Sequence, residues 1–317
     1  MPNIIYKVKR KIQREVNQKH VNDYPDTLEG WEKFPGNPIL GNKDTGTLFD
    51  PFVRKVADRY VMYVSRRKDS CIVKYSSKDG ITWDDAKIVL TGVANSEWET
   101  KVNRACFICK SGIWHLWYTG QIGNESKIGY AKSTNGIQFE RCRENPIIIP
   151  ELPHEGNAVM NPCVLWDEKR NKYRMWYAAG DNYEPDIICY AESEDGIYWN
   201  KLSRPVLQPD KNILYKKYKV GACDVVQVNE KKYIMAYIAY QNLDIARIAV
   251  AISEDGGFAW KDIFSQPVLG PSKSKWDGHA VYKPTLYLEG DKMTIWYNGR
   301  FNTDERIGMS FCKKFNI

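Results

Sequence analysis

Charged side chains stand at matching places in this sequence, and their types indicate acid–base chemistry together with anion binding. Five strand-like segments can be aligned on an opening proline or its substitute, namely Pro51, Ala105, Pro162, Ala222 and Pro284. The residues immediately before these positions are Asp50, Arg104, Asn161, Gly221 and Lys283. A carboxylate can donate or take up a proton, and an arginine fork fits the paired oxygens of a carboxylate or a phosphate.

More polar residues follow the second segment of each unit, namely Arg66, Arg67, Gln121, Asp181, Gln241 and Arg300. Asp224 lies two residues after the alignment point of the fourth unit. A further register, seven residues before the alignment point, contains Asp44, Glu155 and Asp277, and Glu97 and Glu99 flank it in the second unit. Two interpretations remain open. Each carboxylate caps the backbone of a crossing loop, or one of them, with Glu155 first, reaches a cavity as a proton donor.

An internal repeat organises most of the chain. The segment SKDGITW (77–83) recurs as STNGIQF (133–139), SEDGIYW (193–199) and SEDGGFAW (253–260), at intervals of about 60 residues. A strand-like segment with an aromatic-Tyr-small pattern precedes each copy. The Asp-Gly pair, or Asn-Gly in the second copy, supplies the positive-φ turn that connects two strands. Each unit therefore indicates four short strands.

The repeat predicts an all-β fold, a five-bladed β-propeller in one domain over residues 23–317. Residues 28–40 resemble the end of a unit, while the last unit stops before its own outer strand. We therefore expect this N-terminal segment to supply that strand and to close the ring, which removes open sheet edges. The inner strands of a propeller run parallel around the axis. The aligned residues should therefore form a ring at the mouth of a central funnel.

Residues 1–22 form the exception to the repeat. Ile4, Val8, Ile12 and Val16 recur at every fourth position among basic residues, which predicts a basic amphipathic helix. The helix could pack on the propeller or on a second subunit, so an oligomer is possible. The alternative is contact with a membrane surface.

Composition narrows the class of protein. The chain has 317 residues, 43% of them hydrophobic and 27% charged, which excludes disorder as its main state. Its start lacks the apolar core of a signal peptide, so we expect a cytoplasmic protein with its eight cysteines as free thiols. The net charge of +7 permits an acidic ligand, but no basic block beyond the N-terminus indicates nucleic-acid binding. Glycine-rich phosphate loops, zinc-ligand spacings and serine nucleophile motifs are absent from the sequence.

The Ser-x-Asp-Gly-x-x-Trp turn, the following Pro-hydrophobic pair and the Asp50-Pro51 opening resemble the five-bladed propeller glycosidases. These are glycoside hydrolase families 43, 32 and 130 with unclassified relatives, and the resemblance covers about residues 28–317. It implies an active site in the funnel, with Asp50 as base or nucleophile and Glu155 or Asp224 as acid. It implies no cofactor and no metal, apart from a channel-bound cation near His279.

The sequence also departs from those families. The opening reads Phe-Asp-Pro-Phe at 49–52, without the fructosidase pattern. The second and third units begin Asn103-Arg104-Ala105 and Asn161-Pro162, where acids are typical of the families. The Glu-Asp-Pro-Arg signature of family 130 is also missing. The two-carboxylate mechanism of these families can therefore not be assigned to this sequence in full.

The expected function is hydrolysis of a glycosidic bond in an acidic or phosphorylated oligosaccharide. Five cations are expected to face the funnel and to bind the anionic group, namely Arg66, Arg67, Arg104, Lys283 and Arg300. The alternative interpretation pairs them with the acids. Gln121, Asn161, Asp181 and Gln241 would bind sugar hydroxyls. Two other functions stay open: a phosphorylase or glycosyltransferase that uses phosphate or a nucleotide sugar, and a non-catalytic glycan-binding propeller.

Overall fold

β-Strands dominate the computed structural model, which describes residues 2–273 and 276–315. The first four-stranded sheet contains β2 (Leu48–Val56), β3 (Arg59–Arg66), β4 (Cys71–Ser77) and β5 (Lys87–Thr91). Another contains β14 (Lys219–Gln227), β15 (Tyr233–Tyr240), β16 (Ala246–Ser253) and β17 (Lys261–Asp262). Within each sheet the neighbouring strands are antiparallel and consecutive in the chain.

An eight-stranded sheet lies between these two in the sequence. One half contains β6 (Lys101–Lys110), β7 (Ile113–Ile122), β8 (Glu125–Ser133) and β9 (Glu140–Arg141). The other half contains β10 (Ala158–Asp167), β11 (Lys172–Gly180), β12 (Ile187–Ser193) and β13 (Asn200–Lys201). The halves meet at one parallel pairing, between Ala158 of β10 and Ser126 of β8. Each half thus repeats the four-strand order of the other sheets.

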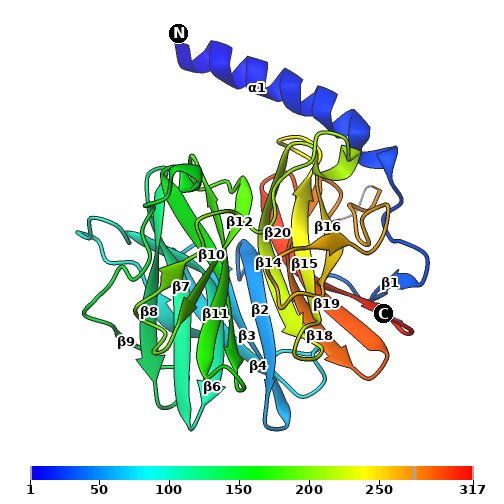
Figure 1. Ribbon diagram of the computed structural model, residues 1–317. Coiled ribbons are helices and arrows are strands. Elements are labelled where there is room, and N and C mark those ends of the chain that lie inside the picture. The colour runs from blue at the N-terminus through cyan, green and yellow to red at the C-terminus, as the bar shows by residue number, and fades with distance from the viewer. Residues whose placement is uncertain (1, 274–275, 316–317) are drawn as a thin grey trace.

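The last sheet joins the two ends of the chain. It contains β18 (Ala280–Glu289), β19 (Lys292–Phe301), β20 (Asp304–Cys312) and, as its outer strand, β1 (Trp31–Lys33). β1 runs antiparallel to β20, with Trp31 opposite Cys312. The indole of Trp31 is buried and packs edge-on against Phe315. An N-terminal segment therefore completes a C-terminal sheet (Figure 1).

The repeated Asp-Gly turns each link two strands of one sheet and also contact a neighbouring sheet. In the turn after β4, Asp79 Oδ1 accepts the backbone amides of Ile81 and Thr82 at 2.8 and 2.7 Å. These amides lower the pKa of Asp79 to about 2. The carbonyl of Gly80 accepts a hydrogen bond from Trp296 Nε1, on another sheet, at 2.9 Å. Trp117 and Trp176 make the same contact with two later turns, so the repeat motif stabilises sheet-to-sheet packing.

The first strand of each four-strand unit carries a bulge at the same place. The register shifts there, and one residue adopts a positive φ. These residues are Asp50, Arg104, Asn161, Ala222 and Lys283. Three of the bulge amides are capped by a side chain of another strand: Asn298 binds Asp50, Ser65 binds Arg104, and Thr119 binds Asn161. In β14 the bulge is one residue shorter, so Ala222 and not Gly221 occupies the equivalent position.

Helical structure is confined to short segments and the N-terminus. α1 (Pro2–Gln18) lies within the stretch predicted to be helical and continues into η1 (Lys19–Asp23), and η2 (Pro153–Glu155) and η3 (Leu214–Lys216) are single turns. Figure 1 shows α1 lying above one end of the sheets, with its N-terminal end projecting beyond them. Within the described residues, no helix is long and apolar enough to cross a bilayer. The division into residues 1–22 and 23–317 stays a prediction.

Candidate functional site

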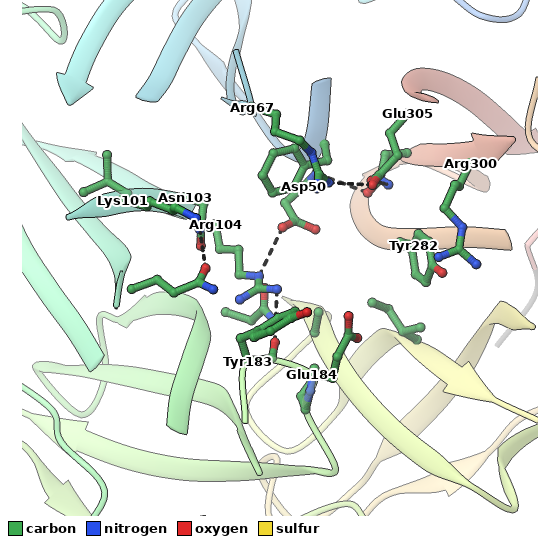
Figure 2. A pocket seen from close by; sticks show the side chains of 18 of the residues that line it. Asp50, Arg67, Lys101, Asn103, Arg104, Tyr183, Glu184, Tyr282, Arg300 and Glu305 are labelled. Carbon is green, nitrogen blue, oxygen red and sulfur yellow. Dashed lines mark hydrogen bonds and ion pairs between the residues drawn. The ribbon is translucent and has the colours of Figure 1, made fainter. Parts of the chain in front are cut away.

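A polar cavity of about 530 Å³ opens where the first strands of several sheets converge. Figure 2 shows side chains from these separate sheets directed toward it. Its charged lining residues are the acids Asp50, Glu184 and Glu305 and the cations Arg66, Arg67, Lys101, Arg104 and Arg300. Amides and aromatic rings complete the wall, namely Asn103, Gln121, Asn161, Asn298, Phe49, Tyr183, Tyr240 and Tyr282. Acid–base groups and anion-binding groups therefore share one cavity.

Asp50 and Arg104 form an ion pair in the wall of the cavity. The bulges at these two residues turn both side chains inward, and Arg104 Nε lies 3.2 Å from Asp50 Oδ2. Arg104 also donates to the carbonyl of Tyr183 at 3.2 Å, which fixes the plane of its guanidinium. The ion pair with Arg104 thus fixes the position of the Asp50 carboxylate, and one side of this carboxylate faces the cavity.

Glu305 is the second carboxylate that is held in place, and it stands at the start of β20. Its Oε1 accepts a hydrogen bond from Arg67 Nη2 at 2.8 Å, and its Oε2 accepts one from Asn298 Nδ2 at 2.8 Å. Burial raises the pKa of Glu305 to about 7, and the nearby Asp50 and Glu184 charges add to that rise against the opposing effect of Arg67 and Arg300. Glu305 can therefore exchange a proton near neutral pH.

Arg300 differs from the other guanidinium groups because it has no acidic partner. Its Nη2 donates to the main-chain carbonyl of Asp244 at 3.0 Å, and its guanidinium lies 5.2 Å from the centre of the Tyr282 ring. Within residues 2–273 and 276–315, no carboxylate lies at ion-pair distance from it, and its buried Nε has no hydrogen-bond partner. Arg300 therefore retains donors for an anionic ligand.

Neutral amides in the wall can bind hydroxyl groups. Asn103 Nδ2 donates to Gln121 Oε1 at 3.1 Å, which orients both side chains. The Oδ1 atoms of Asn103 and Asn161 are buried and accept no hydrogen bond from any described residue. A buried acceptor without a partner costs free energy, and a ligand hydroxyl would remove that cost.

Glu155 does not reach this cavity, so its expected position in the funnel is wrong. It is fully buried at the end of η2, where its carboxylate accepts the amides of Glu151 and Leu152 at 2.7 and 2.8 Å. Tyr177 and Lys201 also donate to it, at 2.5 and 3.0 Å. Burial alone would raise the pKa of Glu155, but these hydrogen bonds outweigh burial and lower it. A carboxyl with a lowered pKa is ionised at neutral pH and therefore carries no proton to donate.

The same arrangement of an acid, a tyrosine and a cation recurs in other units. Glu99 accepts hydrogen bonds from Tyr118 and Arg141, and Asp277 accepts them from Tyr297 and Lys33. These acids thus have a structural role in three units, whereas Asp44 and Glu97 are exposed. Glu155 and Asp277 also accept backbone amides, as the loop-capping interpretation expects, whereas the contacts of the Glu99 carboxylate are to side chains.

Asp224 and Lys283 also point away from the cavity. Asp224 is fully buried, pairs with Arg54 at 2.6 Å and accepts the Leu286 amide at 2.7 Å. Burial opposes ionisation of Asp224, but the charge of Arg54 prevails and its pKa is lowered. The Lys283 ammonium donates to the carbonyl of Cys223 at 2.9 Å inside the core. The expected roles of Asp224 as the acid and of Lys283 as an anion-binding cation do not fit these positions.

Three other predicted residues lie outside the cavity. Gln241 is buried and binds Arg247, and Asp181 is exposed on a neighbouring loop. His279 Nδ1 accepts the amide of Asn302, and its ring packs on Phe301. Burial lowers the pKa of His279, and the charges of nearby Arg14 and Arg300 lower it further. Within the described part of the chain, no cluster of three or more His, Cys, Asp or Glu side chains could hold a metal ion.

The remaining predicted residues do line the cavity, namely Asp50, Arg66, Arg67, Arg104, Gln121, Asn161 and Arg300. Sequence reasoning missed Glu184 and Glu305, which also line it. Glu305 begins the strand after Arg300, a residue that the repeat placed at the funnel. The short hairpin beyond Arg300 is therefore the signal that could have indicated Glu305.

Comparison with known proteins finds similar sequences. Residues 100–249 match a family model described as glycosyl hydrolases family 32 N-terminal domain. The chain is 28% identical over 234 residues to a 1,2-beta-oligomannan phosphorylase of Thermoanaerobacter sp., across 70% of this chain and 73% of that protein. It is 25% identical over 195 residues to an uncharacterised protein of Mycobacterium tuberculosis, and that match spans 58% of this chain but only 62% of that protein's length.

Solved structures share the fold. A thermostable family-43 glycoside hydrolase superposes with a TM-score of 0.69 at 18% identity, over 86% of this chain and 91% of that chain. The beta-1,2-mannobiose phosphorylase of Listeria innocua superposes with a TM-score of 0.71 at 13% identity, over 91% and 97% of the two chains. These matches confirm the resemblance to the propeller glycosidases in sequence and in fold.

Proposed function

We propose that the protein is a five-bladed propeller, closed by β1, that cleaves a glycosidic bond in the 530 Å³ cavity with inorganic phosphate as the attacking group. The observation that carries this proposal is the shared cavity of two fixed carboxylates, Asp50 and Glu305, and the unpaired Arg300. Glycosyl transfer needs a proton for the leaving oxygen and, when phosphate attacks, cations that hold the phosphate.

Glu305 supplies the proton in this mechanism. Its carboxyl donates to the glycosidic oxygen as the bond from that oxygen to the anomeric carbon breaks. A phosphate oxygen forms the new bond to the same carbon, and the products are a sugar 1-phosphate and a shortened saccharide. Asp50 stabilises the positive charge that develops on the sugar ring, and Arg104 keeps its carboxylate oriented. The proton of the attacking hydrogen phosphate restores Glu305.

The cations favour phosphate over water as the attacking group. Arg67 and Arg104 are paired with the two carboxylates, so they serve mainly to position them. Arg300 and the exposed Lys101 remain for the anion. Two relatives with phosphorylase names support this choice, the 1,2-beta-oligomannan phosphorylase and a beta-1,2-mannobiose phosphorylase, also of Thermoanaerobacter sp., that is 31% identical over 43% of this chain. A β-1,2-linked mannoside is therefore the first substrate to test.

Product analysis with and without phosphate tests the proposal. We expect β-1,2-mannobiose with inorganic phosphate to yield a sugar 1-phosphate, seen as a new phosphorus resonance by NMR, and to be left intact without phosphate. Arg300→Ala should raise the KM for phosphate, whereas Arg59→Ala, on an outer ion pair with Asp84, should not. Free monosaccharide at equal rates with and without phosphate would contradict phosphorolysis.

Hydrolysis of an acidic oligosaccharide is the second candidate. In that reaction Arg300 holds the acidic group of the substrate, and Asp50 activates a water molecule. A panel of uronic-acid oligosaccharides in phosphate-free buffer distinguishes it from phosphorolysis. Binding of these sugars without any turnover would indicate the third candidate, a non-catalytic glycan-binding propeller. The cytoplasm remains our proposed location, since phosphate is abundant there.

A further inference from the structure

The N-terminal helix α1 presents its polar face to the body of the protein. Arg10 makes two hydrogen bonds to the buried carboxylate of Asp244, at 2.9 and 2.6 Å. Asn17 donates to the same carboxylate at 2.7 Å, and Arg14 donates to the carbonyl of Asn302 at 3.0 Å. These residues share one side of the helix and fix its rotation about its own axis.

The opposite side of α1 is apolar and uncovered. Val8, Ile12 and Val16 recur at every fourth position, so they lie on one face, and 51%, 56% and 47% of their surfaces are exposed. The side chain of Ile4, the first residue of the predicted stripe, lies outside the described part. Figure 1 shows α1 at the top of the view, with no other element above it. An amphipathic helix that buries its polar face is the reverse of the arrangement expected in a monomer.

We propose that the stripe formed by Val8, Ile12 and Val16 is a dimer interface, on which α1 of a second copy of this chain packs antiparallel. Val8 and Val16 stand equally far from Ile12. About a two-fold axis at Ile12, Val8 of one helix therefore lies opposite Val16 of the other, and Ile12 lies opposite its own copy. The stripe is thus self-complementary, as an isologous interface must be.

Charge supports the antiparallel direction. Lys11 and Glu15 are exposed beside the stripe, one turn apart on the same flank. In the antiparallel pair about Ile12, Glu15 of one helix approaches Lys11 of the other, whereas a parallel pair places these flanks of the two helices on opposite sides of the seam. β-Branched valine and isoleucine are typical of helix-pair seams. Interfacial membrane helices are instead rich in Trp, Phe and Leu, and Val8, Ile12 and Val16 include none of these.

Sedimentation equilibrium over a wide range of protein concentration tests the interface. We expect a concentration-dependent dimer for the natural chain and a monomer for Ile12→Glu, because two like charges then meet at the axis. The matched control is Val228→Glu, which changes a valine of similar exposure, 46%, in the turn between β14 and β15. This control should associate like the natural chain. Circular dichroism checks that all variants fold.

Mixing two oppositely charged variants distinguishes a contact between the two copies of position 12 from other causes of association. Ile12→Glu and Ile12→Lys should each be monomeric alone and should associate when mixed, because each position 12 then meets a charge of opposite sign at the axis. A natural chain that stays monomeric at every concentration would overturn the proposal. If that monomer floats with phosphatidylserine vesicles and Ile12→Glu does not, the stripe binds a membrane and the dimer is rejected.

Discussion

At the scale of single residues, Glu305 makes the sharpest prediction. Its pKa, raised to about 7 by burial, keeps it protonated at lower pH. If Glu305 is the proton donor, kcat/KM should fall tenfold per pH unit above about pH 7, because the protonated fraction falls by that factor. Glu305→Gln should lower turnover by about 100-fold or more and abolish this limb of the pH profile. A rate that does not change between pH 6 and 9 would exclude Glu305 as the donor.

The same pKa predicts how stability changes with pH. The usual pKa of a glutamate is 4.5, so between about pH 4.5 and 7 the folded protein binds more protons at Glu305 than the unfolded chain. The contribution of Glu305 to stability is therefore present below pH 4.5 and is lost as pH rises through 7. Urea unfolding of the natural chain and of Glu305→Gln should diverge at pH 8, with the variant gaining relative stability.

At the scale of elements, α1 and the loop before β16 reach the cavity through Asp244. The carboxylate of Asp244 binds Arg10, and its main-chain carbonyl binds Arg300 in the cavity. Arg10→Ala should loosen this loop and raise the KM for the anionic ligand about tenfold, or about 1.4 kcal/mol, with less change in kcat. Arg59→Ala removes an arginine of equal exposure, 34%, from an ion pair on the outer surface and serves as the control. Equal KM values in both variants would contradict the link.

The turns between sheets make a second prediction at this scale. Gly80 has a φ of +75°, and an added Cβ would lie 2.9 Å from Trp296 Cζ2. Gly290 has a φ of +59° with open space around that position. Gly290→Ala should cost about 1 kcal/mol of unfolding free energy, from backbone strain alone. Gly80→Ala should cost about 1–3 kcal/mol more, because it also displaces a buried indole. Urea denaturation of both variants measures the difference.

At the scale of the whole molecule, the parts that could be predicted from sequence are those that repeat. The turn motif recurs because a glycine carbonyl of each copy accepts a hydrogen bond from an aromatic side chain of another sheet, from a tryptophan in three copies and from Tyr63 in the fourth. The repeat therefore indicated the strands. Asp50 and Arg104 could be placed because the bulge falls at the same register in their strands. Lys283 shares that register, but its long side chain reaches a core carbonyl instead. Glu305 escaped notice because the connection between the second and third strands differs in length and sequence from unit to unit.

The pairing of β1 with β20 makes the last prediction, because it ties the two ends of the chain together. Trp31 is 4% exposed and packs in one cluster with Cys312 and Phe315. Trp31→Ala should cost about 3–5 kcal/mol of unfolding free energy, since the cavity it leaves cannot collapse between paired strands. It should also expose the edge of β20 and promote aggregation on heating. Glu32→Ala, on the exposed side of the same strand, should change stability by less than about 0.5 kcal/mol. Equal unfolding midpoints for the two variants would show that the sheets hold together without this strand.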